Sequence, residues 1–189
     1  MDLPPMSPQS IAQAFIALAS TAKTSIDIAS FYWTLTGGDP ALGGQVPLNV
    51  TIFHCLSTHP PLQLGQDVFD ALSAAAGRGV ALRIVQSQPS KSMPDDDSQA
   101  LAKLYPNTVQ LRSINMTHVL GGGIVHTKFW VVDATSIFVG SANMDWRSLA
   151  QVKELGALLL SCPTVAHDLA ATFESYAHAA RAMRARDNL

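Results

Sequence analysis

One stretch, residues 126–143, constrains this chain more than any other feature. It reads His-Thr-Lys-Phe-Trp-Val-Val-Asp and, after a short turn and the apolar Ile-Phe-Val, Gly-Ser-Ala-Asn. Aromatic and β-branched residues dominate it, which favours two strands joined by a hairpin turn. Because alternate residues of a strand share a face, His126 and Lys128 are predicted to point the same way. The returning strand brings Ser141 and Asn143 to the same place, so an imidazole, an ammonium, a hydroxyl and an amide converge.

Those four groups suit a phosphodiester, whose cleavage needs charge neutralisation, a nucleophile and a proton for the leaving oxygen. Lys128 supplies a point charge for the non-bridging oxygens, and Ser141 and Asn143 supply neutral donors. His126 as a neutral imidazole can attack phosphorus and form a phosphohistidine. Imidazoles exchange protons near neutral pH, so the same residue type also serves as acid or base. The scheme uses no metal and no other cofactor.

The spacing His-x-Lys-x4-Asp-x6-Gly-Ser-x-Asn resembles the signature of the phospholipase D superfamily. The segments 32–37, 143–149 and 151–156 extend the likeness, and with them the chain resembles the first half of the animal phospholipase D family members three and four. Those proteins are lumenal and lysosome-associated, and are described as 5′ single-strand exonucleases with a lipid transphosphatidylation activity. The resemblance covers roughly residues 11–176, apart from an unmatched insertion around residues 38–64.

The resemblance implies an α/β fold, with a mixed β-sheet flanked by helices, and a catalytic set of His126, Lys128, Asp133 and Glu154. Glu154 falls where these enzymes carry the carboxylate that orients the histidine. Asp133 has the other strand parity from His126, so we expect a structural acceptor that holds the hairpin, although the family counts it in the motif. The implied substrate is the 5′ end of single-stranded nucleic acid, with a phospholipid as the alternative.

The superfamily builds one active site from two motif copies, whereas this chain carries one. His167 and His178 lie in the last predicted helix without the surrounding pattern. Two explanations stay open: two copies of the chain associate across a two-fold axis, or the chain is the first half of a longer two-motif protein. A rival interpretation is an inactive half-domain that serves as an interaction module.

Three residues near the motif are secondary candidates. Core packing is the favoured prediction for Trp33, with contact to a substrate base or acyl chain as the alternative. Trp146 and Arg147 are predicted to form a turn close to the chemistry. Arg147 either pairs with Asp145 or meets a substrate phosphate, and the pairing is favoured.

The remaining pattern predicts one domain over residues 1–189, in which helices and strands alternate. The three aspartates at 95–97 are predicted to form the cap and solvated first turn of a helix rather than a metal site. The glycines at 121–123 suggest a flexible approach to the motif strand. Residues 37–65, rich in Gly and Pro, are predicted to be a loop insertion. Helices are expected from Ser7 and Pro163 and over 66–76 and 98–104, strands over 25–33, 80–85, 109–111 and 154–161 (the last one buried), and an exposed tail from Ala179.

Composition limits the partners and the compartment less sharply. Hydrophobic residues make up 48% and charged residues 14%, with a formal net charge of −2, which indicates a globular chain without the basic field of a scaffold-type DNA binder. No apolar run approaches the roughly 18 residues of a bilayer span. The first residues also lack the charged and apolar regions of a signal peptide.

The chemistry of several residues depends on the cellular compartment in which the protein works. Asn49 and Asn115 each begin an Asn-x-Thr motif, which is a glycosylation acceptor in a lumen. Cys55 and Cys162 either form one disulfide or remain thiols. Zinc binding by residues 54–59 is disfavoured because His-Cys-x3-His offers only three ligands.

Overall fold

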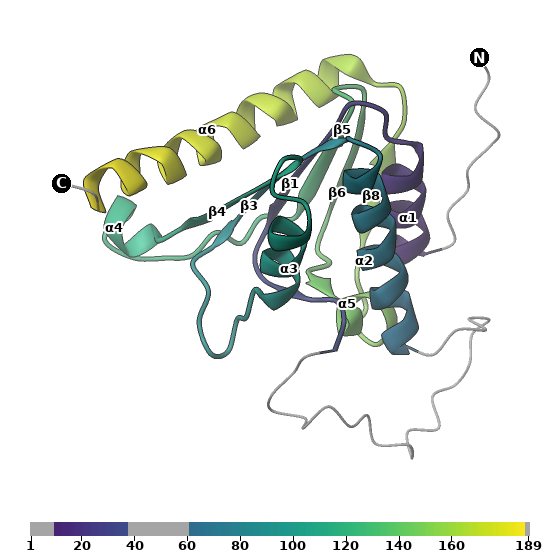
Figure 1. Cartoon of the computed structure of the whole chain (residues 1–189), viewed down its shortest axis with the longest axis horizontal. Coiled ribbons are helices and arrows are strands. Elements are labelled where there is room, and N and C mark those ends of the chain that lie inside the picture. The colour runs from purple at the N-terminus through teal and green to yellow at the C-terminus, as the bar shows by residue number, and fades with distance from the viewer. Residues whose placement is uncertain (1–9, 38–60, 188–189) are drawn as a thin grey trace.

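A mixed six-stranded β-sheet forms the centre of the computed structural model, which describes residues 10–37 and 61–187 (Figure 1). The strand order is β4-β3-β1-β5-β6-β8. Strands β1, β3 and β4 run parallel, and β5, β6 and β8 continue the sheet in antiparallel pairs. The strands are β1 (Ser25–Ser30), β3 (Ala81–Ser87), β4 (Val109–Ile114), β5 (Phe129–Val132), β6 (Ser136–Gly140) and β8 (Gly156–Leu159).

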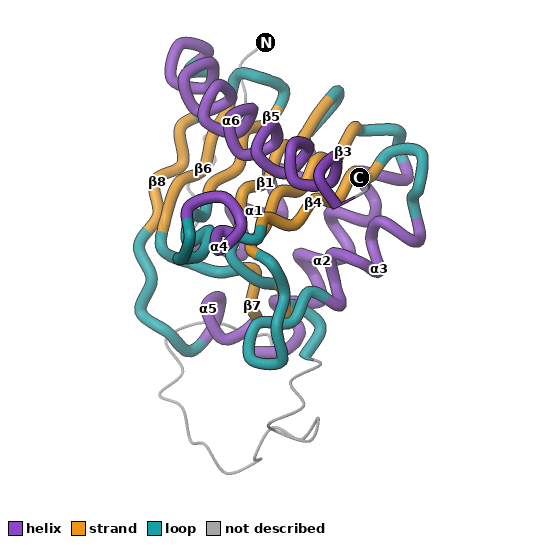
Figure 2. The backbone as a smooth tube through the Cα atoms, turned by 90° about the vertical axis from the view of Figure 1, so that its left-hand side faces the viewer, coloured by secondary structure: helices purple, strands orange, loops and turns teal. Residues whose placement is uncertain are grey.

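Helices cover both faces of this sheet. Helices α1 (Ile11–Thr21) and α2 (Pro61–Gly77) pack on one face, and the long α6 (Pro163–Asp187) crosses the other. Figure 2 shows α6 lying across the strands, with α2 and α3 beyond them. The fold class implied by the resemblance, a mixed sheet flanked by helices, is therefore confirmed. The shorter elements are β2 (Trp33–Thr34), which pairs with β7 (Met144–Asp145), and the helices α3 (Asp96–Leu104), α4 (Met116–Leu120) and α5 (Trp146–Ala150).

Strand β5 is apolar at every position because it is buried on both sides. Trp130 and Val132 belong to the core beneath α1 and α2, whereas Phe129 and Val131 belong to the core beneath α6. Phe15 of α1 stacks on Trp130, with ring centroids 4.4 Å apart and an interplanar angle of 3°. Buried central strands of this kind show continuous hydrophobic runs rather than alternation.

The register brings three chain segments to one edge of the sheet. Ala29 near the end of β1 pairs with Phe129 at the start of β5, and Phe129 pairs with Val139 near the end of β6. The amide of Gly140 donates to the carbonyl of Lys128 at 3.1 Å. The residues that follow β1, precede β5 and follow β6 therefore meet at this edge.

Several predicted element boundaries are corrected by the structure. Ser10, rather than Ser7, caps α1 and accepts a hydrogen bond from Gln13. Helix α2 begins at Pro61, before the predicted start at residue 66. Helix α6 continues to Asp187 instead of giving way to an exposed tail, because small residues such as Ala180, 6% exposed, pack against the sheet.

The predicted buried strand over 154–161 is wrong in its extent and its environment. Only Gly156–Leu159 pairs, and β8 is the last strand of the sheet. Leu155, immediately before it, is 82% exposed. An apolar run alone does not distinguish a central strand from an edge strand whose outer side is uncovered.

Of the three aspartates at the start of α3, the N-cap residue Asp95 and the first-turn residue Asp97 are buried rather than solvated, whereas Asp96 is exposed as predicted. Asp97 accepts hydrogen bonds from the backbone of Leu35 and from the backbone and hydroxyl of Thr36. Asp95 accepts from the side chains of Gln86 and Gln99. These carboxylates hold the segment after β1 to the start of α3, which is a structural role.

The helix before the glycine run, α4, was not recognised from sequence. Asn115 caps α4 by accepting from the amides of Thr117 and His118. Gly121 ends that helix in the left-handed conformation, with φ of 79°, a backbone position that favours glycine. Within the described residues, 10–37 and 61–187, no helix is both long and apolar enough to cross a membrane.

Candidate active site

The two leading candidates, His126 and Lys128, lie just before β5 rather than within it. The paired strand begins at Phe129, so strand parity does not place them. They nevertheless meet at one aromatic ring, that of Phe31. The ring centroids of His126 and Phe31 are 5.0 Å apart at an angle of 60°, and Nζ of Lys128 lies 5.4 Å from the Phe31 centroid. The two groups thus contact the same aromatic ring, so a shared neighbour and not a strand relates them to each other.

Lys128 is the most enclosed cation of this region, with 9% of the residue exposed, whereas His126 is exposed. The ammonium donates to the carbonyl of His126 at 2.7 Å. Burial lowers the pKa of Lys128, and the negative charge of Glu154 opposes that effect. Since screening by water is weak in such a setting, this ammonium can interact strongly with an anion placed beside it.

Ser141 and Glu154 face each other across the junction of β6 and β8. The backbone of Ser141 donates to Leu155 at 2.9 Å, and the amide of Leu155 donates to the Ser141 hydroxyl at 3.0 Å. That hydroxyl donates in turn to the carboxylate of Glu154. Among the described side chains no hydrogen bond joins Glu154 to His126, so the structure replaces the expected contact with one to Ser141.

Asn143 belongs to a second set of interacting polar side chains, together with Tyr32 and Asp145. The Tyr32 hydroxyl donates to Asp145 at 2.7 Å, and burial together with that carboxylate raises the pKa of Tyr32 to about 12. The side chain of Asn143 acts on the same hydroxyl, while its own Oδ1 is buried without a hydrogen-bond partner in the described part of the chain. The Asn143 Oδ1 is therefore a buried acceptor that lacks a hydrogen bond within the described residues, which is rare in folded proteins.

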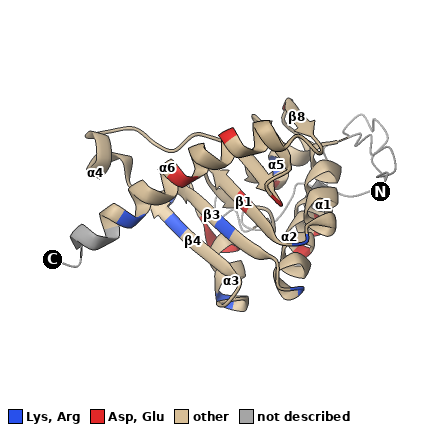
Figure 3. Ribbon diagram, turned by 90° about the horizontal axis from the view of Figure 1, so that it is seen from above, with Lys and Arg blue, Asp and Glu red and all other residues tan. Residues whose placement is uncertain are grey.

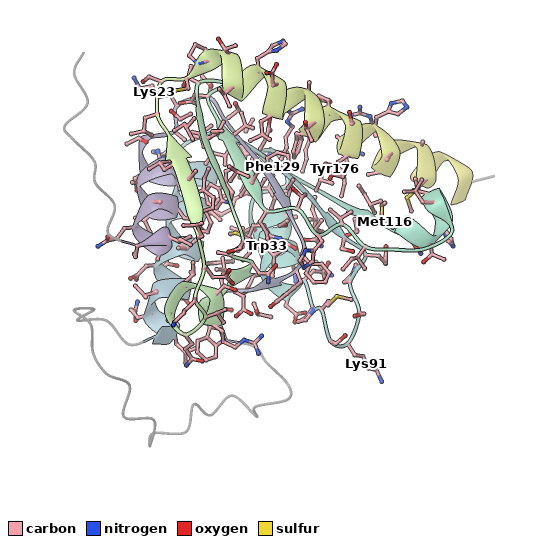
Figure 4. All side chains as sticks on the ribbon, turned by 180° about the vertical axis from the view of Figure 1, so that it is seen from behind. Lys23, Trp33, Lys91, Met116, Phe129 and Tyr176 are labelled. Carbon is pink, nitrogen blue, oxygen red and sulfur yellow. The ribbon has the colours of Figure 1, made fainter. Side chains whose placement is uncertain are left out.

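Arg147 takes the favoured of its two predicted partners. Its guanidinium pairs with Asp145 at 3.1 Å, and its amide donates to the same carboxylate, which caps α5. Trp146 is 3% exposed, with its indole Nε1 buried and without a partner among the described residues. Neither tryptophan candidate presents a surface to a substrate, because Trp33 is fully buried and donates to Ser30 at 2.7 Å. Figure 4 shows Trp33 among the packed interior side chains.

The aromatic residue at the site is therefore Phe31, which sequence reasoning missed. Phe31 and Trp33 are two residues apart, so an extended strand would place them on the same face, but only Trp33 was named as a candidate. The chain leaves β1 at Ser30, which separates the half-exposed Phe31 from the buried Trp33. A signal was present in the position of Phe31, since it directly follows a strand that ends at the sheet edge.

Asp133 lies at the opposite end of β5 from His126. Its carboxylate accepts from the backbone amides of Lys23, Thr24 and Ser25 and from the Thr24 hydroxyl, at 2.8–3.0 Å. Burial alone would raise the pKa of Asp133, but these hydrogen bonds lower it. The position fits the structural acceptor expected from strand parity, and it separates Asp133 from the other motif residues.

A hollow opens beside Glu154, and His126 is not among the residues that line it. It has a volume of about 330 Å³ and is lined by residues of α1, α5 and the segment that leads into β8, including Val152 and Leu155. Val152 is 54% exposed and Leu155 82% exposed. An apolar surface thus adjoins one side of the candidate site.

Basic and acidic residues lie close together on the side of the described structure that Figure 3 shows. In Figure 3, acidic and basic residues alternate over α6, β3, β4 and β1. Arg83 pairs there with Asp27 at 2.6 Å and with Glu174 at 2.5 Å. Residues 10–37 and 61–187 hold no group of three His, Cys, Asp or Glu side chains arranged to bind a metal ion.

Four of the residues named from sequence, Asn49, His54, Cys55 and His59, lie outside the described residues. Cys162 is a free thiol that is half-buried, with its Sγ 3.5 Å from the carbonyl of Leu160. Of the two alternatives for Cys162, disulfide or thiol, the structure has the thiol. The metal question at residues 54–59 stays a prediction.

Comparison with known proteins gives one family. Residues 44–185 match the family described as "PLD3/4, PLD-like domain". The chain is 49% identical over 170 residues to "Phospholipase D Z" of Dictyostelium discoideum and 43% identical over 167 residues to "5'-3' exonuclease PLD3" of Homo sapiens. Each alignment covers 88% of this chain but only 35% and 30% of the relative. The chain therefore spans about a third of the length of these relatives.

Solved structures show the same fold at lower identity. A phospholipase D family member, Nuc from Salmonella typhimurium, superposes with a TM-score of 0.61 and 21% identity, covering 91% of this chain and 90% of Nuc. NucT from Helicobacter pylori gives a TM-score of 0.61 at 16% identity, covering 88% of this chain and 86% of NucT.

Proposed function

This chain belongs to the PLD3/4 family of PLD-like domains, and from that premise we propose that it is one motif-bearing half of a phosphodiesterase. One observation carries the proposal. His126, Lys128 and the Ser141–Glu154 pair arise from three segments that meet at one edge of the sheet, and the imidazole and the ammonium contact the same ring of Phe31. A nucleophile, a partly desolvated cation and polar donors gathered in this way suit a phosphate ester.

In the proposed reaction the neutral imidazole of His126 attacks phosphorus. A bond forms between a ring nitrogen and phosphorus, and the bond from phosphorus to the leaving oxygen breaks as that oxygen takes a proton from a second acid. Lys128 neutralises the non-bridging oxygens during this step. Water then attacks the phosphohistidine, which returns the imidazole and releases the phosphate product.

Glu154 would act on this site through two neighbours. It accepts from the Ser141 hydroxyl, which fixes the end of β6, and its charge favours the ammonium form of Lys128. We therefore assign Glu154 a positioning role and Asn143 a direct one. Asn143 has a buried Oδ1 without a partner in the described region, and a hydroxyl group of the substrate could donate to it.

The second acid is proposed to come from another motif-bearing half. It is supplied either by a second copy of this chain or by the remainder of a longer chain. Two uncovered apolar residues that line the hollow beside Glu154 support this proposal, since Leu155 and Val152 are 82% and 54% exposed. Contiguous apolar surface of this kind is typical of a protein interface.

The proposed substrate is the 5′ end of single-stranded nucleic acid. It is supported by the human relative, which carries the name "5'-3' exonuclease PLD3". A phospholipid is the second candidate, because the relative from Dictyostelium discoideum is named "Phospholipase D Z". Turnover of a fluorescent oligonucleotide, measured beside transphosphatidylation of a glycerophospholipid, separates the two substrates.

Trapping of a labelled phosphoenzyme tests the mechanism. The wild-type chain should acquire label at His126, and H126A should acquire none while keeping its fold, since this side chain is exposed. Counting polypeptides per labelled site then shows whether two chains build one site. A chain that takes no label and remains a monomer would be the inactive interaction module instead.

We also propose, on the family resemblance alone, that the protein works in a lumenal compartment. There the Asn115 motif would be an acceptor for glycosylation. Its Oδ1 accepts from Thr117 and His118, and the amide nitrogen is not used in those two bonds. Mass analysis of the protein from a secretory host, with N115Q as the comparison, tests this assignment.

A further inference from the structure

Phe31, the residue directly after β1, contacts both leading candidates of the site. Its ring centroid lies 5.0 Å from that of His126, and 5.4 Å from Nζ of Lys128. Tyr32 packs edge-on against the same ring, with centroids 5.2 Å apart and an angle of 75°. Phe31 is half-exposed and takes no part in either hydrophobic core. Core packing therefore does not account for a large aromatic side chain at this position.

His126 needs a partner of this kind because little else fixes its ring. The ladder of β5 begins at Phe129, so no strand pairing orients the preceding residues. Within the described part of the chain, the imidazole makes no hydrogen bond or ion pair, and its ring contact is Phe31. A nucleophile that rotates freely spends much of its time out of line with phosphorus.

We propose that Phe31 is a positioning residue, whose ring holds the His126 imidazole and the Lys128 ammonium against one surface so that both meet the same phosphate. The inference rests on the proposed phosphodiesterase function and adds to it the element that aligns nucleophile and cation. Edge-to-face ring contacts have a preferred geometry, which sets the tilt of the imidazole. The face of an aromatic ring attracts a nearby ammonium, which keeps Lys128 beside His126.

The same contact acts on the protonation of Lys128. The titratable groups around this ammonium are His126, which accepts through its carbonyl, and Glu154, whose charge favours the protonated form. Burial lowers the pKa of Lys128, and the charge of Glu154 opposes that effect. Because the face of an aromatic ring favours an ammonium over a neutral amine, the Phe31 ring at 5.4 Å is inferred to act in the same direction as Glu154. Loss of the aromatic ring should therefore lower the pKa of Lys128 further.

Three variants separate positioning from simple packing. F31L removes the aromatic ring but keeps an apolar side chain, F31Y keeps the ring, and F69L makes the same change in α2, where Phe69 packs half-buried against the core. In F31L, the nuclear magnetic resonance signals of the His126 ring should lose their ring-current shift, and the Lys128 ammonium should titrate at lower pH. F31Y and F69L should keep both wild-type values. This measurement needs no turnover.

Kinetics provide the second reading. F31L should lower kcat by about tenfold or more, leave KM within about twofold, and move the basic limb of the pH profile to lower pH, while F31Y restores the wild-type profile. Wild-type His126 and Lys128 signals in folded F31L, or an unchanged kcat and pH profile, would overturn the inference. If the wild-type protein cleaves no phosphodiester, the proposed function fails, and the resonance measurements still decide whether Phe31 holds the two side chains.

Discussion

At the scale of single residues, the site depends on contacts between neighbours that sequence spacing does not specify. Glu154 was expected to orient His126, yet its carboxylate accepts from Ser141 and acts on Lys128 by charge. Both interactions lie on the same edge of the sheet, so the carboxylate still belongs to the site. Its influence passes through the hydroxyl and the ammonium instead of the imidazole.

E154Q tests that route. Without the negative charge the pKa of Lys128 should fall further, because burial lowers it and Glu154 is the group that opposes burial. We expect kcat to fall by roughly tenfold, the typical loss for a residue that supports a catalytic group, and the basic limb of the pH profile to move to lower pH. E174Q is the matched control, since Glu174 lies on α6 and pairs with Arg83 of β3, away from Lys128. An unchanged pH profile in E154Q would show that Glu154 does not act on Lys128.

D133N tests the structural assignment of the remaining motif carboxylate. The pKa of Asp133 is lowered in the fold, so its contribution to stability is complete above the ordinary aspartate value near ~3.9 and is lost as pH falls through the folded value. D133N should reduce the free energy of unfolding by about 1–2 kcal/mol at pH 7. The Asp133 carboxylate accepts hydrogen bonds at both of its oxygens, whereas the asparagine side chain has only one oxygen. Urea unfolding should show that this difference shrinks in acid. A loss of turnover in D133N with stability unchanged would contradict the assignment.

At the scale of elements, helices and strands with a strong hydrophobic pattern can be predicted from the sequence. The position of the outermost strand of the sheet cannot. The periodicity of α1 and α2 and the dense apolar run of β5 reflect burial that the residues themselves encode. The place of β8 at the edge depends on which strands pair, and an apolar run cannot express that. The pair β2–β7 has only two residues in each strand and joins segments far apart in the sequence, so no local sequence pattern predicts it.

The close pairing of β6 and β8 leads to a prediction at the scale of elements. A Cβ added at Gly156 would lie 2.3 Å from the ring of Phe138, which is buried beside Phe15. G156A should therefore displace that ring or open the edge strand, and reduce the free energy of unfolding by about 1–3 kcal/mol. G122A is the control, since a Cβ there meets no atom within 4 Å. Equal stability of the two variants in urea would show that β8 does not pack as closely as described.

At the scale of the whole molecule, the fold class followed from the sequence while the completeness of the site did not. The mixed sheet with helices on both faces was predictable from one motif and its family resemblance. Whether a second motif completes the site is a question of assembly, and the spacing of residues inside one copy holds no information about it. The chain spans about a third of its curated relatives, which leaves both a second copy and a longer chain as sources.

The uncovered apolar surface beside the site provides the test of assembly. Leu155 is 82% exposed, so L155K should change the free energy of unfolding by less than about 0.5 kcal/mol in an isolated chain. If that surface meets a second copy, the buried ammonium should abolish association, and turnover should disappear with it. L120K on α4 is the matched control, because Leu120 is 73% exposed. Sedimentation equilibrium, run beside the oligonucleotide assay, should show a wild-type and L120K dimer that is active and an L155K monomer that is not. Full turnover by a wild-type monomer, or an L155K variant that stays associated and active, would remove Leu155 from the interface and direct the search for the second acid elsewhere.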